Sequence, residues 1–282
     1  MTRVLVTGHS GFIGNRLLET LPPEGIEIMT LPETLDLSLG PPRLPEAGID
    51  GVVHLAALTP HTGRPKTEIL DSNIRITLNL LAALEGNAPR IFVYLNTNVY
   101  GIPAYLPVDE EHPVQPASLY HASKYIGEKL IKDFGRRRRC RTVSLRLFNP
   151  YGPGQKKPFL IPSIIASLRE NRPIELKEPQ SKRDYIFIDD VCSAIARALF
   201  SDTAAGAVYN IASGVSSSNL DIARRLRDVG GIDVPISEMP GGGGAYEVRA
   251  DIGKAERELR WLPRIDLGEG LRKTWEKETH AR

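Results

Sequence analysis

The stretch Thr7-Gly8-His9-Ser10-Gly11-Phe12-Ile13-Gly14 decides the fold. It follows Arg3–Thr7, an apolar run typical of a strand, and it opens a helical pattern over Gly11–Thr20. Glycine lets the chain turn tightly and come close to a pyrophosphate, and the free N–H groups of a helix N-terminus attract the anion. At a strand–turn–helix junction the three glycines predict a nucleotide site, with a merely structural turn as the alternative. The residues expected to contact the cofactor here are Gly8, Gly11, Phe12, Ile13 and Gly14.

Strand and helix patterns alternate along the first two-thirds of the chain. Further strands are predicted at Ile26–Leu31, Gly51–Leu55, Arg90–Leu95 and Thr142–Phe148, and helices at Thr67–Glu85 and Leu119–Phe134. Such alternation predicts a parallel sheet covered by helices on both faces. Ligands of these sheets bind at the carboxyl ends of the strands.

The pattern changes after Phe148, where prolines and glycines predict a loop. The elements predicted beyond it are a helix at Ile161–Glu170, a strand running into a helix over Asp184–Phe200, a strand at Val208–Ala212, and helices near Leu220–Val229 and Lys254–Leu259. Asn219 is the expected cap of the helix near Leu220. The run Gly241–Gly244 favours a flexible surface loop, with a flap over a ligand as the alternative.

The composition is that of an ordinary globular protein. The 282 residues are 41% hydrophobic and 25% charged, and the net charge of +2 demands neither a nucleic-acid nor a membrane partner. Arg136–Arg139 is expected to be a solvated helix end, or else a patch for an acidic surface. Cys140 and Cys192 lack metal-ligand spacing, and we expect no metal site. With no leader and no long apolar stretch, the predicted location is the cytoplasm.

The end of the second strand bears on the choice of cofactor. An acid there would bind the ribose 2′-hydroxyl of NAD, and Glu33 lies one place late for that role. No arginine stands there to meet the 2′-phosphate of NADP. The pattern therefore favours NAD and leaves NADP open. Asp36 and Leu37 are expected near the adenine, with an ordinary turn as the alternative.

Tyr120 and Lys124 lie four residues apart, on one face of a predicted helix. A free tyrosine has a pKa of about 10, too high for ready proton exchange at pH 7. A nearby cation favours the phenolate, so we expect Lys124 to lower the pKa of Tyr120 and make it a general acid/base. The spacing alone is common by chance.

In company with other motifs, the chain resembles the extended short-chain dehydrogenase/reductases, particularly the nucleotide-sugar epimerases, dehydratases and 4-ketoreductases. Beside the glycine motif and the Tyr120/Lys124 pair, the matching segments are His54-Leu55-Ala56-Ala57, Asp71-x-Asn73 with Asn79-Leu80-Leu81, Val99-Tyr100-Gly101, Arg146–Gly154, Arg183-Asp184-Tyr185, Asp189-Asp190-Val191, Arg249-x-Asp251 and Lys254-Ala255. The resemblance implies an α/β fold, a Rossmann-type doubly wound parallel sheet with a smaller C-terminal α/β substrate-binding domain. The dinucleotide-binding domain would span residues 1–160 and about 186–211, and the substrate domain about 161–185 and 212–282.

The same resemblance implies roles for single residues. Tyr120 would be the acid/base and Lys124 its electrostatic partner and holder of the cofactor ribose. Leu55, Ala56 and Ala57 would pass along the cofactor, with Asn73 near it. Asn149 would contact the sugar nucleotide, and Arg183 and Arg249 would grip its diphosphate, a task that suits the planar guanidinium fork. The helices at Thr67–Glu85 and Leu119–Phe134 would pair with a second copy into a four-helix bundle, making a homodimer.

One motif departs from the family pattern. The family has Ser or Thr five residues before the glycine of Val99-Tyr100-Gly101, and here Asn96 takes that place. The Asn96 amide can donate a hydrogen bond but cannot pass on a proton as a hydroxyl can. Thr97 would substitute only if the strand end shifted by one residue, because side chains alternate between the faces of a sheet.

The expected reaction is NAD(P)-dependent hydride transfer at C4 of a nucleotide-diphosphate sugar. Dehydration is disfavoured, because Thr97 and Asn98 stand where dehydratases carry two acids. Epimerisation is the leading expectation and reduction of a 4-keto-6-deoxy sugar the alternative. A non-catalytic NAD(P)-sensing protein is the alternative of another class, prompted by Asn96. A reductase of non-sugar carbonyls is disfavoured by Arg183 and Arg249.

Overall fold

A computed structural model of the chain describes residues 1–21, 25–45, 48–200, 206–239 and 245–280. The glycine run Gly241–Gly244, expected to be a loop or a flap, lies outside the described residues.

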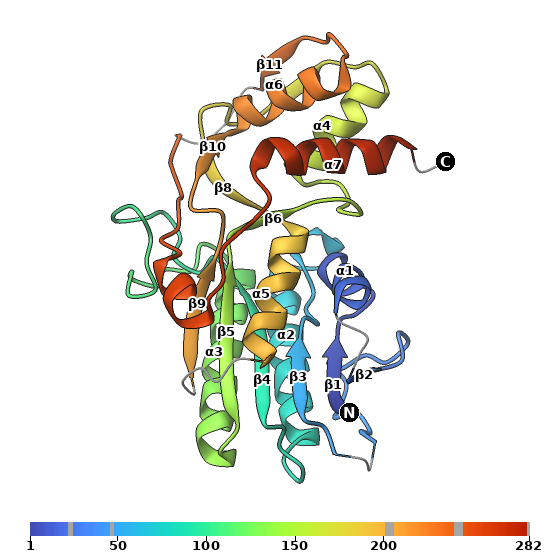
Figure 1. Cartoon of the computed structure of the whole chain (residues 1–282), viewed down its shortest axis with the longest axis vertical. Coiled ribbons are helices and arrows are strands. Elements are labelled where there is room, and N and C mark those ends of the chain that lie inside the picture. The colour runs from blue at the N-terminus through green and yellow to red at the C-terminus, as the bar shows by residue number, and fades with distance from the viewer. Residues whose placement is uncertain (22–24, 46–47, 201–205, 240–244, 281–282) are drawn as a thin grey trace.

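A six-stranded parallel sheet forms the centre of the molecule (Figure 1), in the order β2-β1-β3-β4-β5-β9. The strands are β1 (Thr2–Thr7), β2 (Ile26–Thr30), β3 (Gly51–His54), β4 (Ile91–Thr97), β5 (Arg141–Leu147) and β9 (Ala207–Ile211). The strand order changes direction at β1, which lies between β2 and β3. Ligands of doubly wound sheets bind beyond the carboxyl ends of the strands at such a point, and here that point carries the glycine turn.

Helices cover both faces of this sheet, as the alternation predicted. On one face α1 (Phe12–Thr20) packs against α5 (Ile188–Phe200), and Arg16 of α1 binds Asp189 of α5 with an Nε–Oδ1 distance of 2.6 Å. On the other face α2 (Lys66–Ala83) packs against α3 (Leu119–Arg138). Side chains of β4 alternate between the two cores: Val93 faces α1 and α5, whereas Phe92 and Tyr94 face α2 and α3.

A smaller unit lies beyond the carboxyl ends of the large sheet, in the upper half of Figure 1. It contains a three-stranded sheet of β6 (Asn149–Tyr151), β8 (Lys182–Phe187) and β10 (Ser216–Ser218), and a pair of β7 (Ile174–Leu176) with β11 (Ile236–Glu238). Its helices are α4 (Leu160–Arg169), α6 (Asn219–Gly230) and α7 (Leu267–His280). This unit covers the edge where the glycine turn lies.

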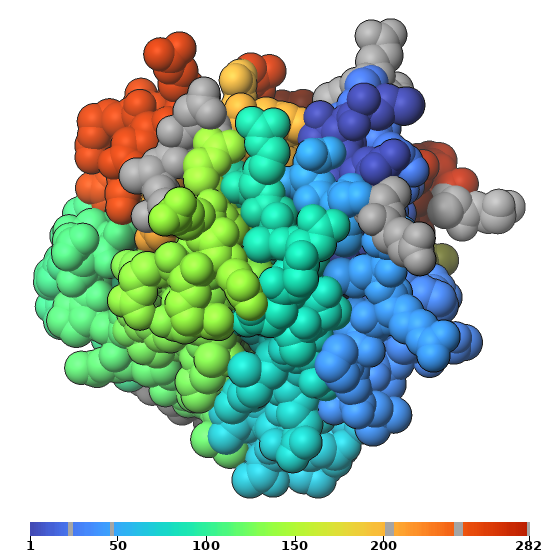
Figure 2. All heavy atoms as spheres, turned by 90° about the horizontal axis from the view of Figure 1, so that it is seen from below, coloured from blue at the N-terminus to red at the C-terminus, as the bar shows by residue number. Residues whose placement is uncertain are grey.

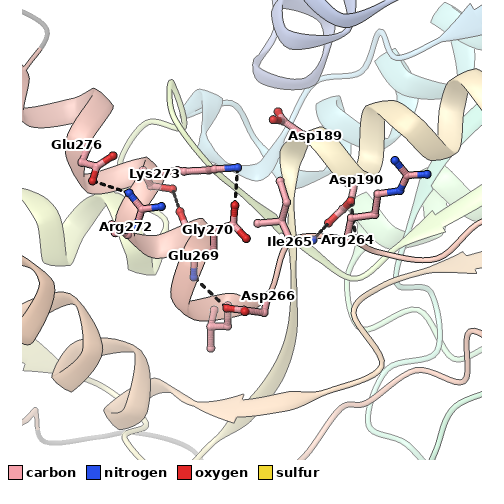
Figure 3. A network of polar contacts seen from close by, with 12 residues as sticks. Asp189, Asp190, Arg264, Ile265, Asp266, Glu269, Gly270, Arg272, Lys273 and Glu276 are labelled. Carbon is pink, nitrogen blue, oxygen red and sulfur yellow. Dashed lines mark hydrogen bonds and ion pairs between the residues drawn. The ribbon is translucent and has the colours of Figure 1, made fainter.

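The C-terminal segment returns to the large sheet before it ends in α7. A π-helical turn at Ala255–Leu259 contacts β9 and α5, and the indole N–H of Trp261 donates to the Ser193 hydroxyl at 2.8 Å. The Asp190 carboxylate accepts the backbone N–H groups of Arg264 and Ile265 at 2.9 and 3.0 Å (Figure 3). The proposed substrate domain, residues 212–282, therefore includes a segment that packs on the helix after β8.

The predicted cap of α6 is wrong by one residue. Ser218, not Asn219, caps the helix, because its hydroxyl accepts the Asp221 N–H while the Asp221 carboxylate accepts the Ser218 N–H. Asn219 is the first helical residue, and its amide joins the Tyr185 hydroxyl to the Glu178 carbonyl.

Helix α7 and four short strands were not predicted. The strands β6, β7, β10 and β11 have three residues each, too few to show a period. In α7, Gly268 and Gly270 disfavour a helix by intrinsic propensity. Gly270 is needed there because a Cβ would overlap the Tyr151 hydroxyl.

Candidate active site

The glycine turn presses against the segment that follows β3. Gly8 has φ +71°, and a Cβ on it would lie 2.6 Å from the backbone nitrogen of Ala56. Both the left-handed backbone and the close approach require glycine. Gly11 caps α1 without any side-chain hydrogen bond, so the first N–H groups of the helix stay available. The turn from Gly8 to Gly14, called the cradle below, presents these N–H groups at a helix N-terminus and fits the pyrophosphate of a dinucleotide. Phe12, Ile13 and Gly14 form the first turn of the helix.

The segment Leu55-Ala56-Ala57 is fixed to the end of β1. The N–H of Leu55 donates to the Thr7 carbonyl at 3.1 Å, and the N–H of Ala56 lies 3.4 Å from the Thr7 hydroxyl. The same hydroxyl lies 2.7 Å from Nδ1 of the fully buried His54. These hydrogen bonds hold the segment Leu55-Ala56-Ala57, which forms the floor of the cradle, against the end of β1.

Asn73 on α2 connects this floor to the Tyr120/Lys124 helix. Its carboxamide accepts the N–H of Leu58 at 2.7 Å and donates to the Ser123 hydroxyl at 3.0 Å. Ser123 in turn donates to the backbone carbonyl of Tyr120 at 2.7 Å. These contacts place the glycine turn and the Tyr120/Lys124 pair at the same edge of the sheet.

Tyr120 and Lys124 occupy the first turns of α3, whose N-cap Ser118 accepts the N–H of His121. The Lys124 Nζ is buried and lies 4.3 Å from the centroid of the Tyr94 ring, while the Tyr94 hydroxyl donates to the Lys124 carbonyl at 3.1 Å. Although part of the Tyr120 side chain is exposed, burial raises the pKa of Tyr120 to about 12. Burial also lowers the pKa of Lys124 to about 7. The expected lowering of the Tyr120 pKa by Lys124 is therefore wrong for the protein's own groups, because burial disfavours the charged phenolate and raises the pKa.

The low pKa of Lys124 makes stability depend on pH. The unfolded chain holds this proton up to about pH 10.5, and the folded protein releases it above about pH 7. Its contribution to the free energy of unfolding therefore rises with pH across this window, by at most about 1.4 kcal/mol per pH unit. Denaturant unfolding at pH 7, 8 and 9 should show the wild type gaining stability relative to Lys124→Met. A difference that stays constant with pH would contradict a buried lysine of low pKa.

Asn96 and Thr97 stand at the end of β4 in unbroken alternation, since β4 pairs with β5 through Thr97. Asn96 lies on the α3 side and is buried; its Nδ2 donates to Glu128 Oε2 at 2.8 Å, and its Oδ1 accepts the Thr97 N–H at 2.8 Å. Since a carboxylate can only accept, these two contacts fix the orientation of the amide. The strand end does not shift, so the Thr97 side chain belongs to the opposite face from α3.

A buried ion pair lies behind Asn96. Glu128 accepts two hydrogen bonds from Arg146, at 3.0 and 2.7 Å, and Arg146 donates a third to the Tyr100 hydroxyl at 2.9 Å. Such a pair is costly to break, because either partner alone would leave an uncompensated buried charge. Asn96 is thus held by a rigid support.

Three residues were expected near the adenosine. Glu33 lies beside the glycine turn, Asp36 accepts hydrogen bonds within its own turn, and Leu37 is buried. β2 ends at Thr30, and the carboxylate of Glu33 reaches to 3.9 Å from His9 Nε2 of the glycine turn while staying 70% exposed. Hydrogen bonds from the Ser38 side chain and from the Ser38 N–H lower the pKa of Asp36. Leu37 is buried, and its carbonyl accepts the amide of Asn79 on α2.

Of the residues expected to bind substrate, two share a face and one does not. Asn149 of β6 pairs with Tyr185 of β8, two residues from Arg183, so Asn149 and Arg183 point to the same side. The Asn149 amide donates to the Asp184 carbonyl at 2.9 Å. Arg249 stands with Glu247, Nε to Oε1 3.7 Å, and Glu247 pairs with Lys182, the neighbour of Arg183, so alternation places Arg249 on the side opposite Arg183.

Sequence reasoning missed the residues that support the site. Glu128 lies one helical turn after Lys124, and Tyr94 lies two residues before Asn96 on the same strand face, so both spacings carried a signal. Ser123 lies between Tyr120 and Lys124, and its position in the sequence gave no signal of its role. Within the described ranges, His, Cys, Asp and Glu side chains form no cluster that could hold a metal ion, and no helix is long and apolar enough to cross a membrane.

Comparison with known proteins gives matches along nearly the whole chain. The model of the NAD dependent epimerase/dehydratase family matches residues 4–212. A GDP-6-deoxy-D-mannose reductase of Pseudomonas aeruginosa is 34% identical, over 96% of this chain and 95% of the relative. A putative UDP-glucose 4-epimerase of Methanocaldococcus jannaschii is 29% identical, over 98% and 99%.

Solved structures agree with this result. The structure of RMD from Pseudomonas aeruginosa with NADPH superposes with a TM-score of 0.88 at 32% identity, covering 99% of this chain and 100% of the other. The UDP-glucose 4-epimerase of Thermotoga maritima with UDP-glucose gives a TM-score of 0.86 at 25% identity, covering 99% of both chains.

Proposed function

The chain belongs to the NAD dependent epimerase/dehydratase family, and we propose on that premise that it transfers hydride at C4 of a nucleotide-diphosphate sugar, with reduction of a 4-keto group as its net reaction. The observation that carries the proposal is the series of contacts from Gly8 through Ala56, Leu58 and Asn73 to the Tyr120/Lys124 helix. It joins a dinucleotide cradle to a general acid at one edge of the sheet.

The proton chemistry falls to Tyr120. Because burial raises the pKa of Tyr120 to about 12, the phenol is protonated at neutral pH. It therefore donates to the oxygen on C4, which becomes a hydroxyl as the carbonyl is reduced. Lys124 lies one turn below and stabilises the phenolate that is left.

Asn96 suits the same direction of reaction. Its Oδ1 accepts the Thr97 N–H and one N–H of Nδ2 donates to Glu128, so the amide has only its second N–H left, which can only donate. A ketone oxygen accepts hydrogen bonds, whereas a sugar hydroxyl must give up a proton to be oxidised. A site with a fixed amide in place of a hydroxyl thus suits a ketone better than an alcohol.

The residues that would hold the cofactor fit a nicotinamide dinucleotide. The first turn of α1 would bind the pyrophosphate, Ala56 and Ala57 would line its path, and Lys124 would hold the ribose. When bound, the nicotinamide supplies the hydride. Solved relatives carry NADPH or NAD. The exposed carboxylate of Glu33 at the glycine turn favours the unphosphorylated ribose.

Epimerisation is the second candidate, because the relative from Methanocaldococcus jannaschii carries a 4-epimerase name at 29% identity. An NAD(P)-sensing protein without catalysis, the candidate of another class, is supported only by the loss of the hydroxyl at position 96.

A substrate panel separates these candidates. Purified protein is mixed with reduced cofactor and the 4-keto-6-deoxy derivatives of GDP-mannose and dTDP-glucose, and separately with oxidised cofactor and UDP-glucose or UDP-galactose. Reduction predicts stoichiometric oxidation of cofactor by a keto sugar, and epimerisation predicts interconversion of the UDP-sugars without net oxidation. Tight cofactor binding with no turnover on any of them would leave only the sensing protein.

We also propose that the protein is a homodimer. Leu78 of α2 and Ile126 of α3 are 45% and 37% exposed, and α2 and α3 pack side by side, as the adjoining teal and lime-green surfaces in Figure 2 show. Two such pairs would make the expected four-helix bundle. A cytoplasmic location stays a prediction.

If α2 and α3 form the dimer interface, a charged residue on their exposed face should prevent association. Leu78→Glu should convert a dimer to a monomer in light scattering, because a buried unpaired charge opposes association. Leu39→Glu is the matched control, since Leu39 is 86% exposed outside these helices. A wild-type protein of monomer mass would contradict the dimer.

A further inference from the structure

Arg183, the expected ligand of the diphosphate, lies flat on an aromatic ring. Its guanidinium carbon is 3.8 Å from the centroid of the Tyr246 ring, and its Nη1 donates to the Tyr246 carbonyl at 3.2 Å and to the Lys182 carbonyl at 3.1 Å. The Arg183 side chain is only 17% exposed. A stacked guanidinium keeps one plane, and only its edge can still donate.

The strand register decides which side chains share this face. Lys182 pairs in parallel with Glu247, since its N–H donates to the Tyr246 carbonyl and its carbonyl accepts the Val248 N–H. Side chains alternate along this segment, so Tyr246 lies on the Arg183 side and Glu247 and Arg249 on the other. The contacts agree, because Glu247 bonds the Ser216 hydroxyl at 2.7 Å and stands beside Arg249.

We propose that Tyr246, rather than Arg249, is the partner of Arg183 in binding the diphosphate of the nucleotide sugar. The inference rests on the proposed function and adds a positioning residue to it. The Tyr246 ring holds the guanidinium in the plane that presents its free edge to phosphate oxygens. Asn149 lies on the same face through the pairing of β6 with β8.

Glu178 is the group that the diphosphate must displace. Its Oε2 lies 3.5 Å from Arg183 Nη2 and accepts the Ser181 hydroxyl at 3.1 Å. At 3.5 Å the contact with Arg183 is long for a charge-assisted hydrogen bond, so a phosphate oxygen can replace the carboxylate. Glu178 thus holds Arg183 in place and competes with the ligand.

The test measures binding of UDP, GDP and dTDP by calorimetry, because binding needs no turnover. With whichever of these binds the wild type, Arg183→Ala and Tyr246→Leu should each weaken affinity about tenfold or more, since the oriented fork is lost. Tyr246→Phe keeps the ring and should stay within about twofold of the wild type. Arg249→Ala, on the opposite face, is the matched control and should also stay within about twofold. Glu178→Gln should tighten binding.

Turnover gives the second readout. Tyr246→Leu should raise KM for the nucleotide sugar and leave kcat nearly unchanged, and its cofactor affinity and melting temperature should match those of Tyr246→Phe. Loss of affinity in Arg249→Ala with none in Tyr246→Leu would overturn the assignment, and so would the absence of binding by all three nucleotides. Tyr120→Phe should bind these nucleotides as the wild type does. A failure of the proposed proton transfer would therefore appear in turnover and not in nucleotide binding.

Discussion

Replacing Tyr120 with Phe should lower turnover of the nucleotide sugar by about 10²- to 10⁴-fold, the range for removing a positioned general acid. Of Tyr120, Asn96 and Thr97, the phenol is the one expected to give its proton to the C4 oxygen, since Asn96 is a fixed amide and Thr97 lies on the other face. In the described part of the chain, no hydrogen bond from the Tyr120 hydroxyl holds another residue in place. The variant should therefore keep its cofactor affinity and its melting temperature.

Tyr125→Phe is the control for this experiment. Tyr125 lies on the same helix, and its ring contacts Lys129 at 4.6 Å, a contact that phenylalanine retains. The control should keep full activity. A Tyr120→Phe enzyme as active as the control would remove Tyr120 from the chemistry.

Replacing Gly8 with Ala should abolish cofactor binding and destabilise the fold. The new Cβ would lie 2.6 Å from Ala56 N and 2.8 Å from Leu55 C, and both are backbone atoms that cannot move without shifting the cradle. The φ of +71° adds roughly 1–2 kcal/mol of strain for a non-glycine residue. Titration with NADH and NADPH, together with thermal unfolding, measures both effects.

Gly63→Ala separates backbone strain from the close approach. Gly63 has φ +73°, and a Cβ there would meet nothing within 4 Å. The free energy of unfolding of Gly63→Ala should fall only by the roughly 1–2 kcal/mol that the strained backbone costs. The variant should bind the cofactor as the wild type does. Equal losses in the two variants would show that the contact with Ala56 is not what makes Gly8 necessary.

The large sheet could be predicted because its signals are local. Each strand is an apolar run bounded by turn residues, and the glycine turn marks where the first strand meets the first helix. The small unit could not be predicted so well. Its three-residue strands depend on partners far along the chain, as Ser217 of β10 depends on Arg183 of β8, and Gly270 joins a helix only because the Tyr151 ring lies against it.

For the site, sequence reasoning could name residues but not their contacts. The Tyr120/Lys124 pair follows from helix geometry, yet the pKa of Tyr120 depends on burial, which no motif reports. Asn96 was visible as a departure, but the carboxylate that fixes its amide, Glu128, comes from a helix 32 residues on. Likewise, the side on which Arg249 lies depends on the pairing of Lys182 with Glu247, a contact between distant segments.

The most direct test of hydride transfer at C4 is isotopic. The enzyme is given reduced nicotinamide cofactor carrying deuterium at both C4 positions, together with a nucleotide-linked 4-keto-6-deoxy sugar, and the product is analysed by proton NMR. The account predicts deuterium at C4 of the sugar and nowhere else, formed by the wild type and not by Tyr120→Phe. Deuterium at another carbon, or a product formed equally well by the Phe variant, would contradict it.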